Sequence, residues 1–227
     1  ASSTVSRVLA SIRSYYLYLL RNGQIDSDPT MAITTPKTEK KQPKALSSSQ
    51  VDLLLNQPKL SDNKGIRDKA MLELLYATGI RVSELIGLDV SDVNLSMGYI
   101  RCSNNKGERV IPIGNKAIDA LRLYLDKSRD EILKNYDEKA LFVNRMGARI
   151  SRQGFWKIIK QYQISSGIDV DITPHLLRHS FAAHLIQNGA DLESLKSMMG
   201  HSDSTNVYTC LLDDNIKRVY EKTHPRA

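Results

Sequence analysis

The stretch Thr173-Pro174-His175-Leu176-Leu177-Arg178-His179-Ser180 lies near the C-terminal end of the chain and opens an amphipathic pattern. Thr173 suits an N-cap and Pro174 the first helical position, so the spacing predicts a helix over residues 174–188. His175 then lies in the first turn, where the positive end of the helix dipole disfavours an imidazolium and leaves a ring that can accept a proton. Arg178 follows on the same face, and its planar fork matches two phosphate oxygens. The stretch therefore predicts a base beside a phosphate clamp.

Four residues outside this stretch extend the predicted site. Arg81 begins the predicted helix 81–88, where backbone amides favour an anion, and it either clamps a phosphate or pairs with Glu84. Lys106 lies in a predicted hairpin turn, where its ammonium either donates a proton or stays solvated. His201 follows a glycine, and Tyr208 follows a polar segment that would present its phenol as a nucleophile. Two arginines would stabilise charge developing on an attacked phosphate, so this chemistry needs no metal ion or other cofactor.

The histidines also allow a competing hypothesis, a metal-dependent phosphohydrolase. His175 and His179 are spaced i, i+4, with a third histidine downstream as the remaining ligand. Zincin chemistry requires a glutamate after the first histidine, and Leu176 stands there, while the cationic Arg178 would oppose a divalent ion. His179 and His184 are better interpreted as packed core residues.

The composition mildly favours a nucleic-acid partner. The chain has 32 Lys+Arg against 25 Asp+Glu, a formal net charge of +7. The two cysteines, Cys102 and Cys210, lie far apart, which disfavours a disulfide scaffold or a zinc ribbon and fits a reducing cytoplasm. We find no secretory leader and no apolar run of about eighteen residues, so we expect a cytoplasmic protein that does not span a membrane.

The N-terminal part predicts a helix and a linker. Thr4–Arg21 has helical periodicity and ends at Asn22-Gly23. A lone helix cannot bury its apolar stripe, so residues 1–26 are interpreted as the last helix of a truncated helical domain. Residues 27–45 have three prolines and no periodicity, and predict an extended basic linker. Its lysines either remain solvated or follow a phosphate backbone; they are Lys37, Lys40, Lys41 and Lys44.

Residues 46–227 predict one mainly α (α+β) domain, in which helices pack beside a small antiparallel sheet. Two strands, Gly98–Cys102 and Arg109–Ile113, flank a polar turn, and Leu141–Val143 is expected as a third strand. The helical patterns cover residues 47–57, 64–77, 81–88, 115–134, 151–166, 174–188, 191–199 and 213–222.

Together these residues resemble the tyrosine recombinase (phage-integrase-like) family in order and approximate spacing. The motifs Ala77–Leu85, Thr173–Ala182, Gly200–Asp203 and His224–Ala227 are similar to those of bacterial Xer recombinases, closest to the XerD type. The resemblance covers nearly the whole chain. It implies a C-shaped clamp on duplex DNA, formed by a core-binding domain (represented by residues 1–26), the linker 27–45 and a catalytic domain (46–227).

The resemblance also implies a reaction, which is cleavage and rejoining of DNA through a 3′-phosphotyrosyl intermediate and a Holliday junction, as in chromosome dimer resolution. The alternatives are a catalytically silent DNA-binding relative or fragment, and a mobile-element integrase. Within the family pattern Arg81 and Arg178 would be the phosphate ligands, Lys106 the acid and His175 the base. His201 would be the hydrogen-bond donor to the phosphate, and Tyr208 the nucleophile.

The partners implied by the resemblance are a double-stranded DNA recombination site and further recombinase subunits. The family assembles as a tetramer on DNA, with or without a second Xer recombinase, and an FtsK-type translocase can act as activator. The terminal helix 213–222 is expected to pack on a neighbouring protomer through Val219 and Tyr220, with an intramolecular cap as the alternative. Compared with the family pattern, the segments around Lys106 and between His201 and Tyr208 are short, and Cys210 replaces a histidine.

Overall fold

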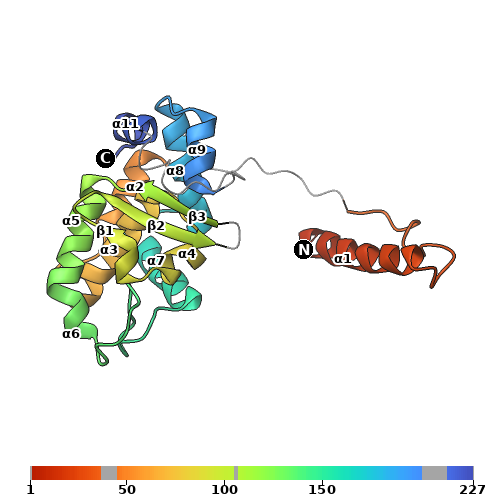
Figure 1. Cartoon of the computed structure of the whole chain (residues 1–227), viewed down its shortest axis with the longest axis horizontal. Coiled ribbons are helices and arrows are strands. Elements are labelled where there is room, and N and C mark those ends of the chain that lie inside the picture. Colours follow the sequence, from red (N-terminus) through yellow and green to blue (C-terminus); the bar gives the residue numbers. More distant parts are fainter. Residues whose placement is uncertain (1, 37–44, 105–106, 201–213, 227) are drawn as a thin grey trace. The chain divides into compact units, whose positions relative to one another are not determined.

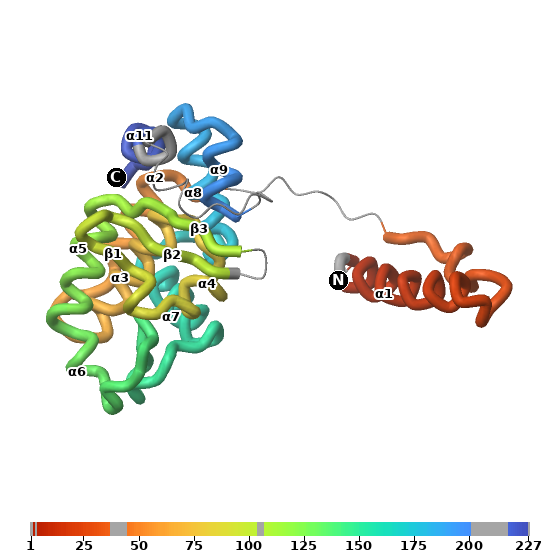
Figure 2. Tube along the Cα trace, viewed as in Figure 1, coloured from red at the N-terminus to blue at the C-terminus, as the bar shows by residue number. Residues whose placement is uncertain are grey.

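The computed structural model describes residues 2–36, 45–104, 107–200 and 214–226 (Figures 1 and 2). The chain divides into two units, residues 1–42 and 43–227. Each unit has its own internal contacts. Among the described residues we find no helix long and apolar enough to cross a membrane.

The first unit consists of α1 (Ser2–Arg21) and the segment that follows it. The sequence predicts an extended chain here, but residues 28–36 turn back along the helix. Arg13 donates to Thr35 Oγ1 at 3.0 Å and to the carbonyl of Ile33, and Thr30 is buried. An apolar face of α1 remains exposed, because this unit alone offers it too little cover. Its members are Val5, Val8, Ile12, Tyr15 and Tyr18.

The second unit is mainly helical with one small sheet, which confirms the predicted fold class. The predicted helices are present, although the one expected over 115–134 is divided by a π-helical turn at Leu125–Arg129. The helices are α2 (Ser48–Leu55), α3 (Asn63–Thr78), α4 (Val82–Gly87), α5 (Asn115–Tyr124), α6 (Asp130–Ile132), α7 (Arg152–Ser166), α8 (Pro174–Gln187), α9 (Leu192–Met199) and α11 (Asp214–Thr223).

Local capping explains where several helices begin and end. Ser47 accepts from the backbone N–H of Gln50, whose side chain bonds back to the N–H of Ser47, which forms a capping box before α2. Thr173 accepts from the N–H of Leu176 at 3.1 Å and caps α8, as predicted. Gly79, in the left-handed region at φ 57°, ends α3.

The sheet consists of β1 (Val93–Asn94), β2 (Tyr99–Asn104) and β3 (Gly107–Pro112), in the order β1-β2-β3 with antiparallel pairing. In the register of β2 and β3, Cys102 faces Arg109. Helix α4 contacts β2 and α9 contacts β3, so the sheet lies against the helices that carry the candidate site (Figure 1).

The third strand predicted at Leu141–Val143 was wrong, and Val93–Asn94 takes that place in the sheet. Leu141–Val143 is fully buried but makes a single isolated bridge, between Val143 and Arg149. Phe142 stacks on Tyr124 with ring centroids 5.5 Å apart. A short apolar run fits a buried loop as well as a strand, and here the run passes through the core without lying beside a strand.

The core of the second unit surrounds α3, which is buried along most of its length and contacts α2, α4, α5 and α8. Its C-terminal end leads directly into the turn that bears Arg81. The buried position of α3 therefore fixes where that turn lies relative to α8.

The terminal helix α11 packs on α8 of its own chain. Tyr220 is 1% exposed, and its hydroxyl accepts from the backbone N–H of Gly114 at 3.0 Å. Val219 is half-buried against the same core. In the single chain these two side chains thus form the intramolecular cap that was the alternative expectation, and their packing on a neighbouring protomer stays a prediction.

Candidate active site

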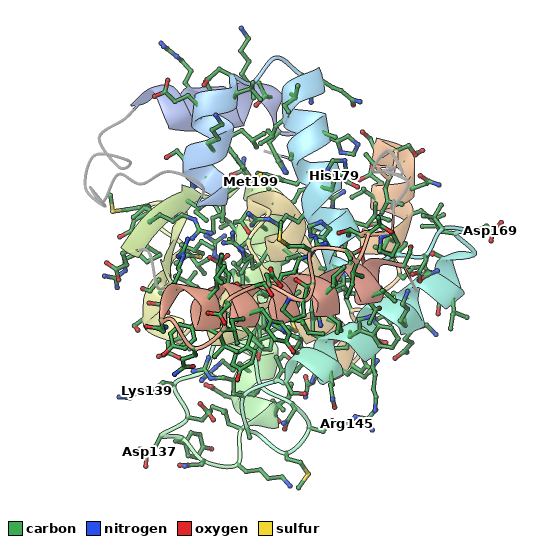
Figure 3. All side chains as sticks on the ribbon, turned by 90° about the vertical axis from the view of Figure 1, so that its right-hand side faces the viewer. Asp137, Lys139, Arg145, Asp169, His179 and Met199 are labelled. Carbon is green, nitrogen blue, oxygen red and sulfur yellow. The ribbon has the colours of Figure 1, made fainter. Side chains whose placement is uncertain are left out.

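Arg178 lies in the N-terminal half of α8 and binds two segments that are distant in the sequence. Its side chain is buried, and its guanidinium donates to the carbonyl of Gly79 and, at 2.8 Å, to the carbonyl of Met199. Met199 ends α9, and Figure 3 labels it together with His179 on α8. Arg178 therefore holds the turn between α3 and α4 beside the end of α9.

Gly79 is required at the first of these turns. Its φ is positive, and a Cβ added there would lie 2.2 Å from Cδ1 of Phe181 on α8. Only glycine allows the backbone to approach α8 this closely. The close approach places Arg81, two residues later, next to Arg178.

Arg81 is the N-cap residue of α4, and its side chain remains 42% exposed. Its backbone N–H donates to Glu84 Oε2 at 2.7 Å, and its guanidinium lies 3.5 Å from Glu84 Oε1. The pairing with Glu84 is therefore present as a long side-chain contact, and the exposed part of Arg81 leaves its phosphate-binding role a prediction.

Glu84 and Arg109 form a buried pair that the sequence interpretation missed. Arg109 donates to Glu84 Oε1 at 2.8 Å and Oε2 at 3.0 Å, and its Nε donates to the carbonyl of Met198 at 2.9 Å. Gly200 packs on the same guanidinium, since an added Cβ would lie 2.9 Å from Arg109 Cζ. The only signal in the sequence is an arginine among the apolar residues of a strand.

Two guanidinium groups, those of Arg81 and Arg109, therefore contact the Glu84 carboxylate, and the charge of a third, Arg178, also interacts with it. Burial, followed by the charge of Arg81, lowers the pKa of Arg178 to about 10, and Arg109 acts in the same direction. Arg178 is still a cation at neutral pH. An anion bound between Arg81 and Arg178 would offset the unbalanced positive charge, which is the electrostatic requirement of a phosphate site.

A cavity of about 470 Å³ opens beside Arg81. Cys102 lines it, but burial raises the pKa of that thiol to about 12, so the side chain stays a neutral thiol and is a poor nucleophile. The polar lining residues are Arg81, Ser83, Glu84, Arg101, Ser103 and Asp92. The cavity thus presents the exposed face of the Arg81 and Glu84 cluster to a ligand.

The described histidines have distinct environments. His175 is exposed in the first turn of α8, at the predicted place, and His179 is half-buried. His184 is a core residue, as interpreted, since its Nε2–H donates to the carbonyl of Leu46 and its Nδ1 accepts from the hydroxyl of Tyr76, each at 2.8 Å. Both ring nitrogens of His184 are engaged and unavailable to a metal. Over the described ranges, no three His, Cys, Asp or Glu side chains form a group that could hold a metal ion.

Several predicted residues lie outside the described residues, and their neighbours mark their places in the sequence. Asn104 ends β2 and Gly107 begins β3, on either side of Lys106. Gly200 is the C-cap of α9 and precedes His201. The others outside the described ranges are Tyr208 and the lysines Lys37, Lys40, Lys41 and Lys44.

Comparison with known proteins gives consistent results. The model of the phage integrase family matches residues 44–214. The tyrosine recombinase XerD of Halalkalibacterium halodurans is 49% identical, with 100% of this chain and 77% of that protein aligned. The tyrosine recombinase XerD of Staphylococcus epidermidis is 48% identical, with 100% and 78% aligned.

Solved structures show the same fold. The crystal structure of XerA recombinase matches with a TM-score of 0.64 at 26% identity, over 100% of this chain and 78% of that one. The Tn1549 transposon integrase in complex with a circular intermediate DNA has a TM-score of 0.74 at 19% identity, over 96% and 78%. At that identity the likeness concerns the fold alone.

Proposed function

The chain belongs to the phage integrase family and is a site-specific tyrosine recombinase, and we propose that Arg81 and Arg178 bind the scissile phosphate of its DNA site. The observation that carries this proposal is the buried Arg178 guanidinium, whose charge interacts with that of Arg81, the arginine that lines the cavity. A phosphate that gains charge in the transition state is stabilised most by donors already fixed in place. The carbonyls of Gly79 and Met199 fix Arg178 in this way.

Cleavage would exchange one phosphodiester for another. The phenol oxygen of Tyr208 attacks the phosphorus atom, and its proton passes to His175. The bond from phosphorus to the 5′ oxygen breaks, and Lys106 supplies the proton that the leaving 5′ oxygen requires. The product is a 3′-phosphotyrosyl link and a free 5′ hydroxyl.

Rejoining would be the reverse reaction with a new 5′ hydroxyl. Because the phosphotyrosyl link keeps the energy of the original bond, no nucleotide triphosphate is consumed, and strand exchange proceeds through a Holliday junction. His201 would donate a hydrogen bond to a non-bridging phosphate oxygen. The exposed position of His175 in the first turn of α8 leaves its ring accessible to a substrate and supports its assignment as base.

The finer assignments concern partners and organisation. We propose that the protein acts as a tetramer on DNA in chromosome dimer resolution, with a second Xer recombinase and an FtsK-type translocase as activator, in the cytoplasm where chromosomal DNA lies. Residues 1–26 would complete a core-binding domain, and the lysines of the linker 27–45 would follow the phosphate backbone on the way to the catalytic domain 46–227. The division into two units and the 77% coverage of the XerD relative support this organisation.

The test is cleavage of a nicked suicide duplex carrying a Xer-type site, in EDTA, followed by a denaturing gel and mapping of the adduct. We expect a covalent adduct at Tyr208 that EDTA leaves intact and that Tyr208→Phe abolishes. DNA binding without any adduct would instead establish the silent-binder alternative. An adduct that requires a divalent ion would exclude the proposed chemistry.

A further inference from the structure

Arg109 does not line the cavity, but it binds the carboxylate that does. Its two terminal nitrogens hold the two oxygens of Glu84 at 2.8 and 3.0 Å, and both residues are 8% exposed. This fork geometry is the strongest way in which a protein binds a carboxylate. The guanidinium of Arg81 lies further from the same carboxylate, at 3.5 Å, on the exposed side.

The carboxylate of Glu84 has two opposite effects on a bound phosphate. Its oxygen accepts from the backbone N–H of Arg81 and so fixes the start of α4. Its negative charge, however, borders the cavity, where it would repel a phosphate and attract the Arg81 side chain away from it. The pairing with Arg109 leaves the hydrogen bond to the start of α4 in place and offsets the negative charge beside the cavity.

We infer that Arg109 is a positioning residue of the recombination reaction, whose forked pairing with Glu84 keeps the Arg81 guanidinium directed to the scissile phosphate. The inference rests on the proposed function, in which Arg81 is a phosphate ligand. The third donor of Arg109 reaches the carbonyl of Met198, so the same side chain also fixes β3 to the end of α9. A lysine has one ammonium and cannot reproduce two parallel bonds to Glu84 together with this third bond.

The test compares two suicide substrates, one with the natural phosphate at the cleavage position and one with a neutral methylphosphonate there. The methyl group removes the negative charge that Glu84 would repel. With full-length Arg109→Gln we expect cleavage of the phosphate substrate to slow by about 100-fold relative to wild type. On the methylphosphonate the defect of the same variant should shrink by roughly tenfold or more, because the neutral phosphoryl group is not repelled by Glu84.

A second variant tests the same idea independently of the substrate. Adding Glu84→Gln to Arg109→Gln removes the negative charge that Arg109 no longer offsets, while the amide oxygen can still accept from the N–H of Arg81. The double variant should recover roughly tenfold of the cleavage rate on the phosphate substrate. A double variant that is no faster than Arg109→Gln alone would overturn the inference.

Arg67→Gln is the matched control. Arg67 is also buried, also binds a carboxylate through two nitrogens (Asp68 Oδ1, at 3.0 and 2.7 Å), and also donates to a carbonyl (Val143, 3.1 Å). It does not line the cavity. We expect Arg67→Gln to lower the melting temperature as Arg109→Gln does, and to change the two cleavage rates by the same factor.

The outcomes separate this inference from the proposed function. If wild-type protein forms no Tyr208 adduct, the proposed function fails. If it does, but Arg109→Gln slows both substrates equally, Arg109 serves only the fold and the inference is overturned. A wild-type rate in Arg109→Gln would overturn it as well, whereas a defect confined to the charged phosphate supports it.

Discussion

Acidification should lower the unfolding stability of the second unit through one histidine, His224, which follows α11. Its ring is 5% exposed and stacks on Tyr220, with centroids 4.7 Å apart and planes at 8°. Its Nε2–H donates to the carbonyl of Tyr76 at 3.3 Å, and its Nδ1 accepts from the backbone N–H of Arg226 at 3.1 Å. A second ring proton would therefore point at another donor.

Burial is the main reason that the pKa of His224 falls to about 4. The bond to the Tyr76 carbonyl opposes the shift, and the charges of Arg226 and His184 add to it. An unfolded histidine titrates near pH ~6.5, so the unfolded state binds a proton that the folded state refuses. The stability contributed by the neutral ring is complete above that value and is lost as the pH falls towards 4. From pH 7 to pH 5 the loss is about 2 kcal/mol.

The assay is urea unfolding at pH 7 and pH 5, followed by fluorescence of Trp156. This is the one tryptophan of the chain, and it lies on α7, so the signal reports the second unit. His224→Gln keeps a donor and an acceptor but does not titrate, and all other groups are shared with wild type. Wild type should lose about 2 kcal/mol more than His224→Gln between the two pH values. Equal losses in the two proteins would refute the reasoning.

Three other predictions follow from the structure. Gly79→Ala should cost about 3 kcal/mol in thermal unfolding, because its Cβ would meet Phe181, whereas Gly167→Ala, with similar φ but nothing within 4 Å, should cost only about 1 kcal/mol. Arg226→Met should cost about 3 kcal/mol in urea unfolding, since it removes the forked partner of the buried Glu73; a change below about 1 kcal/mol would show that the pair is not formed. Raising salt from about 50 to 200 mM should weaken DNA binding, measured by fluorescence anisotropy, by on the order of 1,000-fold, and a salt-independent affinity would contradict contacts to the phosphate backbone.

Features that depend on a few adjacent residues could be predicted from the sequence. The cap at Thr173 depends on a hydrogen bond within one turn, and it appears where expected. The order of Arg81, His175 and Arg178 along the chain likewise predicts a phosphate site, and the structure places Arg81 and Arg178 within reach of each other's charge. Local signals of this kind are independent of how distant segments pack.

Features that depend on packing could not be predicted. Glu84 was recognised only as a neighbour of Arg81, because its stronger partner Arg109 lies 25 positions away and on a strand. The third strand was placed at Leu141–Val143 because a short buried run carries no periodicity that separates strand from loop. The contact of residues 28–36 with α1 was also missed, since proline-rich segments are equally compatible with extension.

The position of Arg178 depends on contacts along the whole length of α8. Ser180 Oγ accepts from the N–H of Leu46 at 2.9 Å, and Asn188, just after the helix, donates to the carbonyl of Thr223 at 2.6 Å. Leu46 lies near the start of the second unit and Thr223 ends α11, so α8 holds the two ends of this unit as well as Arg178. Since a packed helix moves as a rigid element, a displacement of either end is transmitted to Arg178. The placement of Arg178 is therefore a property of the folded unit as a whole, and changes at Leu46 or Thr223 should alter cleavage although neither residue lines the cavity beside Arg81.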